Sequence, residues 1–301
     1  METSMSEETI GFVGVGLMGQ GMAANLLKAG FTVSVVAHRN RGPVDDLVAQ
    51  GATEAESLAE LAAVSSVIHI CAPGSPQVEA IVAAMMPTMQ AGSVIVDCST
   101  SDPNSTTALA NKLAQAGHHM ADAPLGGTPV QAQNGELATM VGADPVVFER
   151  LEPVIAAWAK TIVHIGPCAA GHKMKLLNNF LSLGYAALYS EALALSEKVG
   201  ISTKEFDSVI RGSRMDCGFY QTFMGYAVEG NRESHKFTLS NALKDLRYLE
   251  AMADEVGLSN PIGNAAKNSF AMALAAGGDG PNDYVPHLVD FVAARNGVSK
   301  A

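Results

Sequence analysis

The chain has 301 residues, of which 48% are hydrophobic and 16% are charged, which suits a folded protein of two domains and excludes extensive disorder. The net charge is −11 without any run of lysine or arginine, which argues against nucleic acid or an anionic membrane surface as a partner. A small anionic substrate stays compatible, because a local cationic pocket can form in an acidic protein.

The first predicted element is a short buried strand at residues 9–13, followed by a helix that ends near residue 28. Between them lies a Gly-x-Gly-x-x-Gly motif in its proper context of strand, turn and helix. Gly14 permits the tight turn, Gly16 lets a pyrophosphate approach the backbone, and Gly19 lets helix and strand pack closely. We therefore expect a dinucleotide to bind at the start of this helix, on Gly14, Gly16, Leu17, Met18 and Gly19.

The second predicted strand, residues 31–36, ends where NAD-binding folds usually place an acidic residue that binds the ribose hydroxyls. Here that position is Ala37, and the cations His38, Arg39 and Arg41 follow it. Because a guanidinium binds a phosphate through two parallel hydrogen bonds, we expect NADP(H) rather than NAD(H), with Arg39 favoured as the nearer contact. The alternative is a polar surface loop whose arginines point into solvent, in which case NAD would serve equally well.

Strand and helix signals alternate as far as residue 166. Further strands are predicted at 66–71, 93–96, 118–121, 137–141 and 161–165, with helices near 43–50, 76–86, 104–116 and 145–159. This alternation predicts an α/β fold of Rossmann type, a mostly parallel sheet with helices on both faces. Ligands of such sheets bind beyond the carboxyl ends of the strands, where Ala37, Ala72, Pro73, Ser99 and Gly126 fall.

From about residue 169 the pattern changes to helical periodicity without a convincing strand. Helices are predicted near 169–199, 203–211, 217–228, 240–256, 262–275 and 284–294, separated by glycines. We therefore expect a dinucleotide-binding domain at residues 1–166 and an all-α domain at residues 167–301, with the substrate cleft where the two face each other.

The long helix at 169–199 carries two polar residues of interest. Lys175 and Asn179 are four residues apart and share one face, so an ammonium and a carboxamide could hold one substrate oxygen between them. The alternative is a solvated lysine and a capping asparagine. This helix is also apolar over too much of its circumference for one exposed position, which burial in an all-α domain or a partner subunit would explain. We expect a homodimer or a dimer of dimers.

The four cysteines are scattered without metal-ligand spacing, so we expect reduced thiols and no metal site. The N-terminal segment is polar and acidic, unlike a secretion signal, and no apolar run approaches the length of a membrane span. These features favour a cytoplasmic protein.

Five motifs in order together resemble the β-hydroxyacid dehydrogenase family, the 3-hydroxyisobutyrate dehydrogenase-like enzymes, over nearly the whole chain. They are the glycine motif from Phe12 to Leu26, Asp97-Cys98-Ser99-Thr100, Asp122-Ala123-Pro124 with the glycines after it, Gly171 to Asn179, and Lys244-Asp245-Leu246. The resemblance implies a Rossmann domain, an all-α domain, usually a dimer, and hydride transfer between a nicotinamide and a small hydroxyacid or its carbonyl.

The resemblance also implies roles for individual residues. Lys175 would exchange the proton and Asn179 would hold the same oxygen or the substrate carboxylate, while Ser99 and Thr100 would lie near the nicotinamide. Lys244 would close over the cofactor, or, as the alternative, pair with a neighbouring acid on its helix. For Asp245 a structural role is favoured.

The substrate loop departs from the family pattern, which usually reads Ser-Gly-Gly after Asp-Ala-Pro-Val. Here Gly126, Gly127 and Thr128 stand in that place, and we expect them to bind the acid group of the substrate. Semialdehydes of methylmalonate, tartronate or succinate head the candidates. Sulfolactaldehyde follows, because reductases for it have a similar Gly-Arg-Thr loop. Imine reductases, which usually have Asp or Tyr at the position of Lys175, and a non-catalytic dinucleotide-binding scaffold are the remaining alternatives.

Overall fold

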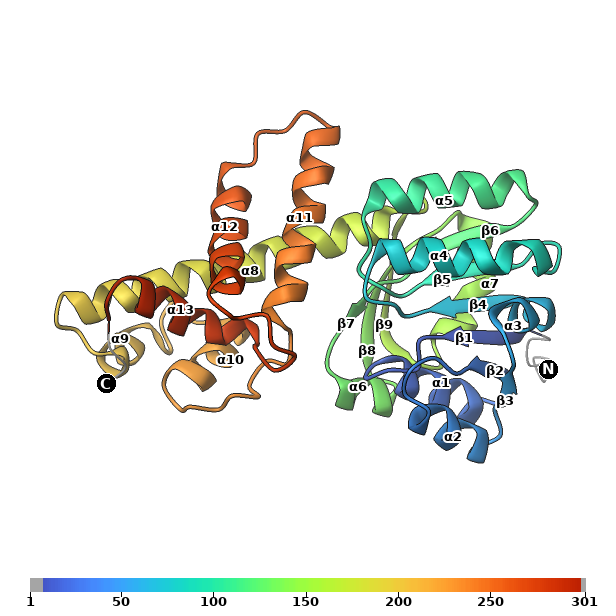
Figure 1. Cartoon of the computed structure of the whole chain (residues 1–301), viewed down its shortest axis with the longest axis horizontal. Coiled ribbons are helices and arrows are strands. Elements are labelled where there is room, and N and C mark those ends of the chain that lie inside the picture. Colours follow the sequence, from blue (N-terminus) through green and yellow to red (C-terminus); the bar gives the residue numbers. More distant parts are fainter. Residues whose placement is uncertain (1–7, 299–301) are drawn as a thin grey trace. The chain divides into compact units, whose positions relative to one another are not determined.

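The computed structural model describes residues 8–298, and the chain divides into two compact units, residues 1–175 and 176–301 (Figure 1). The boundary falls inside one long helix, α8 (Ala170–Lys198). The segment at residues 1–7, on which the expectation about a secretion signal rests, lies outside the described residues. Within residues 8–298, no helix combines the length and the apolar character that crossing a membrane requires.

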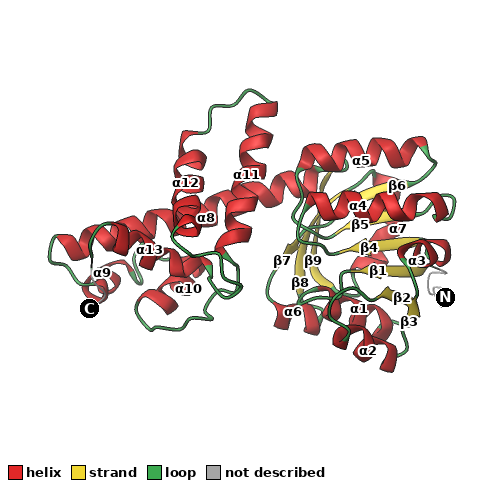
Figure 2. Ribbon diagram, viewed as in Figure 1, coloured by secondary structure: helices red, strands yellow, loops and turns green. Residues whose placement is uncertain are grey.

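The first unit is built on one nine-stranded sheet (Figure 2). Six strands run parallel, in the order β3 (Thr53–Ala55), β2 (Thr32–Val36), β1 (Thr9–Val13), β4 (Val67–Ile70), β5 (Val94–Asp97) and β6 (His119–Asp122). Beyond β6, β8 (Leu137–Gly142) pairs antiparallel with β6 and β7 (Leu125–Gly126), and parallel with β9 (Ala159–Gly166). The connecting helices are α1 (Gly19–Lys28), α2 (Gly42–Ala49), α3 (Leu58–Val64), α4 (Ser75–Met85), η1 (Met86–Thr88), α5 (Pro103–Gln115), α6 (Pro129–Asn134) and α7 (Pro145–Ile155).

The sheet is covered on both faces, so its central strands are buried throughout. All four residues of β4 and all four of β5 are buried. Successive side chains point to opposite faces. Val67 therefore joins the core that contains Leu26 of α1 and Leu151 of α7, whereas Ile68 joins the core that contains residues of α3 and α4.

The predicted α/β fold with a helical second half is confirmed, with local corrections. The helix expected at 145–159 ends at Ile155, because Trp158 packs fully buried into the sheet core and β9 begins at Ala159. Five short elements were not predicted: β3, α3, η1, β7 and α6.

The second unit is helical throughout its described part. After α8 come α9 (Thr203–Ile210), α10 (Gly218–Ala227), α11 (Leu239–Glu255), α12 (Pro261–Ala275), the short η2 (Val285–His287) and α13 (Leu288–Arg295). Side chains such as Leu183, Phe223, Leu246 and Phe270 form its own core. Helix α11, which carries Lys244, packs along α12.

Candidate active site

The turn between β1 and α1 has the geometry that a pyrophosphate needs. Gly14 adopts a φ of +96°, and a Cβ there would lie 2.1 Å from the carbonyl oxygen of Cys71, which follows β4. A Cβ at Gly19 would lie 2.1 Å from the carbonyl oxygen of Gly14, whereas one at Gly16 would meet no heavy atom within 4 Å. Gly14 and Gly19 thus bring strand, turn and helix into contact, while the backbone of Gly16 stays open to a ligand.

The start of α1 is prepared for an anion. Among the described residues no side chain caps this helix, whose N-cap residue is Met18, and its first turn holds no acidic residue. Leu17, just before it, is largely exposed. With no side-chain cap and no acid in its first turn, the positive end of this helix suits phosphate oxygens, and the residues present fit a dinucleotide.

The two arginines in the loop after β2 differ in their acidic partners. The guanidinium of Arg41 donates to both carboxylate oxygens of Glu54, at 2.9 and 2.7 Å, and lies 3.2 Å from Asp45. Arg39 is exposed, as is His38, and no carboxylate within residues 8–298 forms a salt bridge with it. Two acids thus hold Arg41, and Arg39 retains the unneutralised charge.

The loops after β4 and β5 are tied together by Ser99. Its hydroxyl accepts a hydrogen bond from the backbone N–H of Ala72 at 2.9 Å, and its own N–H donates to Oδ1 of Asp97 at 2.9 Å. Ser99 is buried and Thr100 is half-buried, whereas Pro73 is exposed. Ser99 therefore fixes the relative position of the two loops that follow these neighbouring strands.

The first turn of α8 is attached to the end of β6. Oδ1 of the fully buried Asp122 accepts from the backbone N–H of Ala169, and Oδ2 accepts from that of His172, both at 2.5 Å. Burial raises the pKa of the Asp122 carboxyl, against the opposite influence of His172 and of these two N–H groups.

The ring of His172 makes a second attachment. Its Nε2 lies 3.1 Å from the carbonyl oxygen of Ser99, and its Nδ1 lies 2.9 Å from Oγ1 of Thr106 in α5. Because a carbonyl only accepts, Nε2 carries a proton. Oδ2 of Asp97 lies 3.8 Å from Nε2 of this ring, and Oδ2 of Asp122 lies 3.7 Å from its Nδ1.

Lys175 follows on the same helix and is half-buried, whereas Lys173 is exposed. One turn later Asn179 is buried, and its Nδ2 donates to Oδ2 of Asp245 at 2.7 Å. This bond fixes the amide orientation, since a carboxylate can only accept. Nζ of Lys244 lies 3.2 Å from Oδ1 of Asp245, so Lys244 forms a salt bridge with the neighbouring acid on its helix.

The glycine-rich loop that was predicted to bind substrate contains a left-handed glycine and a hydrogen-bonded hydroxyl. Gly127 has a φ of +130°, and a Cβ there would lie 3.0 Å from both Gln131 and Leu137, so a side chain at this position would be strained. Thr128 begins α6, where its hydroxyl and backbone N–H both bond to Gln131 in a capping box. The Thr128 hydroxyl, expected to bind substrate, thus has a local partner, and Gly126 lies in β7 beside it.

Comparison with known proteins is consistent with this geometry. Residues 9–166 match the model for the NAD-binding domain of 6-phosphogluconate dehydrogenase, and residues 169–286 match that for the NAD-binding region of NADP-dependent 3-hydroxyisobutyrate dehydrogenase. The 2-(hydroxymethyl)glutarate dehydrogenase of Eubacterium barkeri is 33% identical over 89% of this chain and 86% of its own length.

The chain belongs to the β-hydroxyacid dehydrogenase family. Another relative, the 3-hydroxyisobutyrate dehydrogenase of Pseudomonas aeruginosa, is 32% identical over 89% of this chain and 92% of its own. A solved structure of Mycobacterium tuberculosis 3-hydroxyisobutyrate dehydrogenase with L-serine superposes with a TM-score of 0.84, at 25% identity, over 95% of this chain and 99% of that one. This member of the family is an oxidoreductase that uses a nicotinamide dinucleotide, as the sequence predicted.

Two residues that sequence reasoning left without a site role stand out in this β-hydroxyacid dehydrogenase-family protein. Asp122 and His172 hold the turn that precedes Lys175, although they are 50 residues apart in the chain. The available signal was an acidic residue ending a predicted buried strand, where a lone carboxylate needs hydrogen-bond donors.

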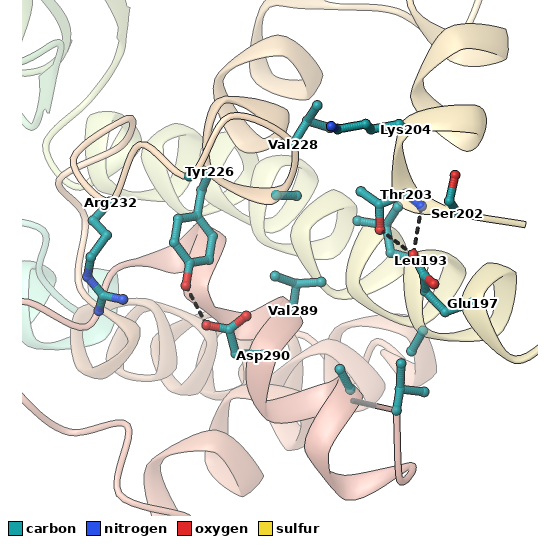
Figure 3. A pocket seen from close by; sticks show the side chains of 15 residues that line it. Leu193, Glu197, Ser202, Thr203, Lys204, Tyr226, Val228, Arg232, Val289 and Asp290 are labelled. Atoms are coloured by element: carbon teal, nitrogen blue, oxygen red, sulfur yellow. Dashed lines mark hydrogen bonds between the residues drawn. The ribbon is translucent and has the colours of Figure 1, made fainter. Parts of the chain in front are cut away.

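A cavity of about 740 Å³ in the second unit is lined by none of the predicted site residues (Figure 3). Its wall contains a hydrogen bond from the Tyr226 hydroxyl to Asp290 and one from Thr203 to Glu197. Neither Lys175 nor Asn179 lines it.

Proposed function

We propose that the chain transfers hydride between NADP(H) and a short β-hydroxyacid or its semialdehyde, with Lys175 as the proton-exchanging group. The observation that carries the proposal is the attachment of the α8 first turn to the ends of β5 and β6, through His172 and Asp122. This edge of the sheet is where Rossmann folds bind their ligands. A half-buried ammonium one turn further along α8 suits a developing oxyanion there.

A bound nicotinamide supplies the hydride in reduction and accepts it in oxidation. In reduction the Lys175 ammonium stabilises the charge that grows on the carbonyl oxygen and then donates a proton to it. In oxidation the neutral amine takes the proton of the substrate hydroxyl. Asn179, oriented by Asp245, holds the same oxygen or the substrate carboxylate.

The acid group of the substrate is assigned to the loop at Gly126 and Gly127. Backbone N–H groups of a glycine-rich loop can bind a carboxylate without any side chain. The Thr128 hydroxyl bonds to Gln131, so its contribution is secondary unless that bond opens. Relatives named for 2-(hydroxymethyl)glutarate and 3-hydroxyisobutyrate, both carboxylic acids, support an acidic substrate. We place semialdehydes of three or four carbons first.

A substrate panel tests this assignment. Consumption of NADPH and of NADH is followed by absorbance with methylmalonate, tartronate and succinate semialdehydes, sulfolactaldehyde, uncharged bulky ketones and cyclic imines. The proposal expects turnover of the short acidic aldehydes, fastest with NADPH. Activity confined to uncharged ketones or imines would refute it, and turnover of sulfolactaldehyde alone would move the assignment to that substrate.

For the assembly we propose that a second copy of the chain covers an apolar stripe on α8. Leu181, Leu188 and Leu195 recur every seven residues and are 58%, 58% and 64% exposed. Leu193, by contrast, is buried in the core of the second unit. A seven-residue apolar repeat along an exposed helix suits another helix of the same kind, and a symmetric pair would bury the stripe on both copies.

A further inference from the structure

Helix α8 begins without a cap of its own. Its N-terminal flanking residue is Ala169, which has no side-chain acceptor and is the one non-glycine residue among residues 8–298 with a positive φ, at 76°. A residue with a Cβ is disfavoured in this left-handed conformation, so the surrounding structure must hold it there. Whatever holds Ala169 in this conformation also holds the first turn of α8 in place.

Asp122 supplies the missing cap from a distant part of the chain. Its two oxygens accept from the backbone N–H groups of Ala169 and His172, 47 and 50 residues away, at 2.5 Å each. These are donors that the first turn of a helix leaves without intrahelical partners. A carboxylate at this end of a helix is also favoured by the helix dipole.

Two glycines leave the space that the Asp122 carboxylate occupies. A Cβ at Gly142 would lie 2.3 Å from Oδ1 of Asp122, and a Cβ at Gly171 would lie 2.8 Å from Oδ2. Neither glycine could carry a side chain without displacing the carboxylate. Asp122 therefore sits in a close-fitting socket between β8 and α8, with its two acceptor atoms aimed at the two N–H groups.

His172 ties the same turn to a second part of the unit. Its fully buried ring lies against the Ser99 carbonyl after β5 and the Thr106 hydroxyl of α5. The backbone of this residue is held by Asp122 and its side chain by these two groups. The turn is thus attached to the ends of two adjacent parallel strands.

We propose that Asp122, with His172, is a positioning residue that sets where the Lys175 ammonium lies relative to the dinucleotide-binding edge of the sheet. The inference rests on the proposed function, which gives Lys175 the proton transfer. Lys175 follows His172 by three residues, or about 4.5 Å along a helix axis. A tilt or fraying of the first turn is therefore carried directly to Lys175, and a misplacement of about 1 Å can cost about 100-fold in rate.

The test replaces Asp122 by Asn, which keeps the shape but substitutes an NH₂ group for one acceptor. We expect kcat to fall about 10- to 100-fold, while the Kd for NADPH, from fluorescence titration of the substrate-free protein, stays within about twofold. Ser202→Ala is the matched control, because it removes a helix N-cap in the second unit. It should lower the Tm and leave kcat unchanged at temperatures where circular dichroism shows both variants folded.

The same variants are combined with Lys175→Ala. If Asp122 acts through Lys175, Asp122→Asn should lower kcat further by less than about twofold in that background. A readout without turnover comes from ¹³C-methylated lysines observed by NMR. The Lys175 signal, assigned by its loss in Lys175→Ala, should shift in Asp122→Asn and not in Ser202→Ala.

The outcomes separate the inference from the proposed function. If Lys175→Ala is impaired but Asp122→Asn keeps kcat and the Lys175 signal, the positioning role is refuted and the proposed function stands. An equal loss from Asp122→Asn with and without Lys175 also refutes it. If Asp122→Asn does not fold, His172→Gln decides by the same criteria, with a smaller expected loss. Normal turnover in Lys175→Ala overturns the proposed function and the inference together.

Discussion

His69 lies in the middle of β4 with its ring stacked on Phe12 and edge-on to Trp158. The indole of Trp158 donates a hydrogen bond to Nε2 of His69 at 3.4 Å. The ring is fully buried, and this burial lowers the pKa of His69 to about 3. The folded protein thus keeps His69 neutral where the unfolded chain would protonate it.

This burial makes stability depend on pH in a defined window. Between the unfolded pKa near 6.5 and the folded pKa of about 3, the unfolded chain binds one more proton. His69 therefore gives its full stability above pH 6.5, and that stability falls by about 1.4 kcal/mol per pH unit as the pH drops below it. Urea unfolding at several pH values should show this slope, and His69→Gln, which does not titrate, should flatten it. An unchanged slope in the variant would show that other groups cause the acid sensitivity.

Removing the charge of Arg39 and releasing Arg41 from an acid should have opposite effects on the preference for NADPH over NADH. Arg39 carries the unneutralised charge, so Arg39→Ala should reduce the preference for NADPH over NADH by about tenfold in kcat/KM, less at high salt. Glu54→Gln removes an acid that holds Arg41, so it should raise the preference for NADPH. Steady-state kinetics with both cofactors measure these ratios. Equal use of both cofactors by the unmodified protein would exclude the NADP assignment.

At the scale of elements, α8 serves two roles along its length. Its first turn is fixed to the sheet by Asp122 and His172, whereas its continuation exposes the apolar stripe at Leu181, Leu188 and Leu195. Leu188→Glu should place a charge in the middle of the interface, where burying it is costly. Light scattering during size-exclusion chromatography should report a dimer or tetramer for the unmodified chain and a smaller species for the variant. A monomeric unmodified protein at micromolar concentration would contradict the proposed assembly.

The elements that the sequence predicted well are those whose hydrophobic pattern extends over many residues. Short apolar runs located the strands that form most of the sheet, and helical periodicity located the helices of the second unit. The missed elements are short: β3 has three residues and β7 has two. Their pairing to neighbouring strands, rather than their own composition, determines them, so no local pattern reveals them.

At the scale of the whole molecule, the sequence located the glycine-rich turn, because the motif and its strand-turn-helix context coincide there. The turn at Gly14–Gly19 forms between strand and helix, as its spacing indicated. The sequence could not reveal contacts between distant segments. The bond from the Ala169 N–H to Asp122 and the salt bridge from Arg41 to Glu54 depend on which strand ends meet in the folded sheet.

The central claim is that Lys175 exchanges the proton during hydride transfer. The most direct test compares Lys175→Ala with Lys173→Ala, using the best substrate and NADPH at saturating concentrations. We expect Lys175→Ala to lower kcat by about 10²- to 10⁴-fold, with the Kd for NADPH nearly unchanged because the phosphates bind at the Gly14–Gly19 turn. Lys173 is exposed, so its variant should keep normal turnover. Near-normal kcat in Lys175→Ala would contradict the account.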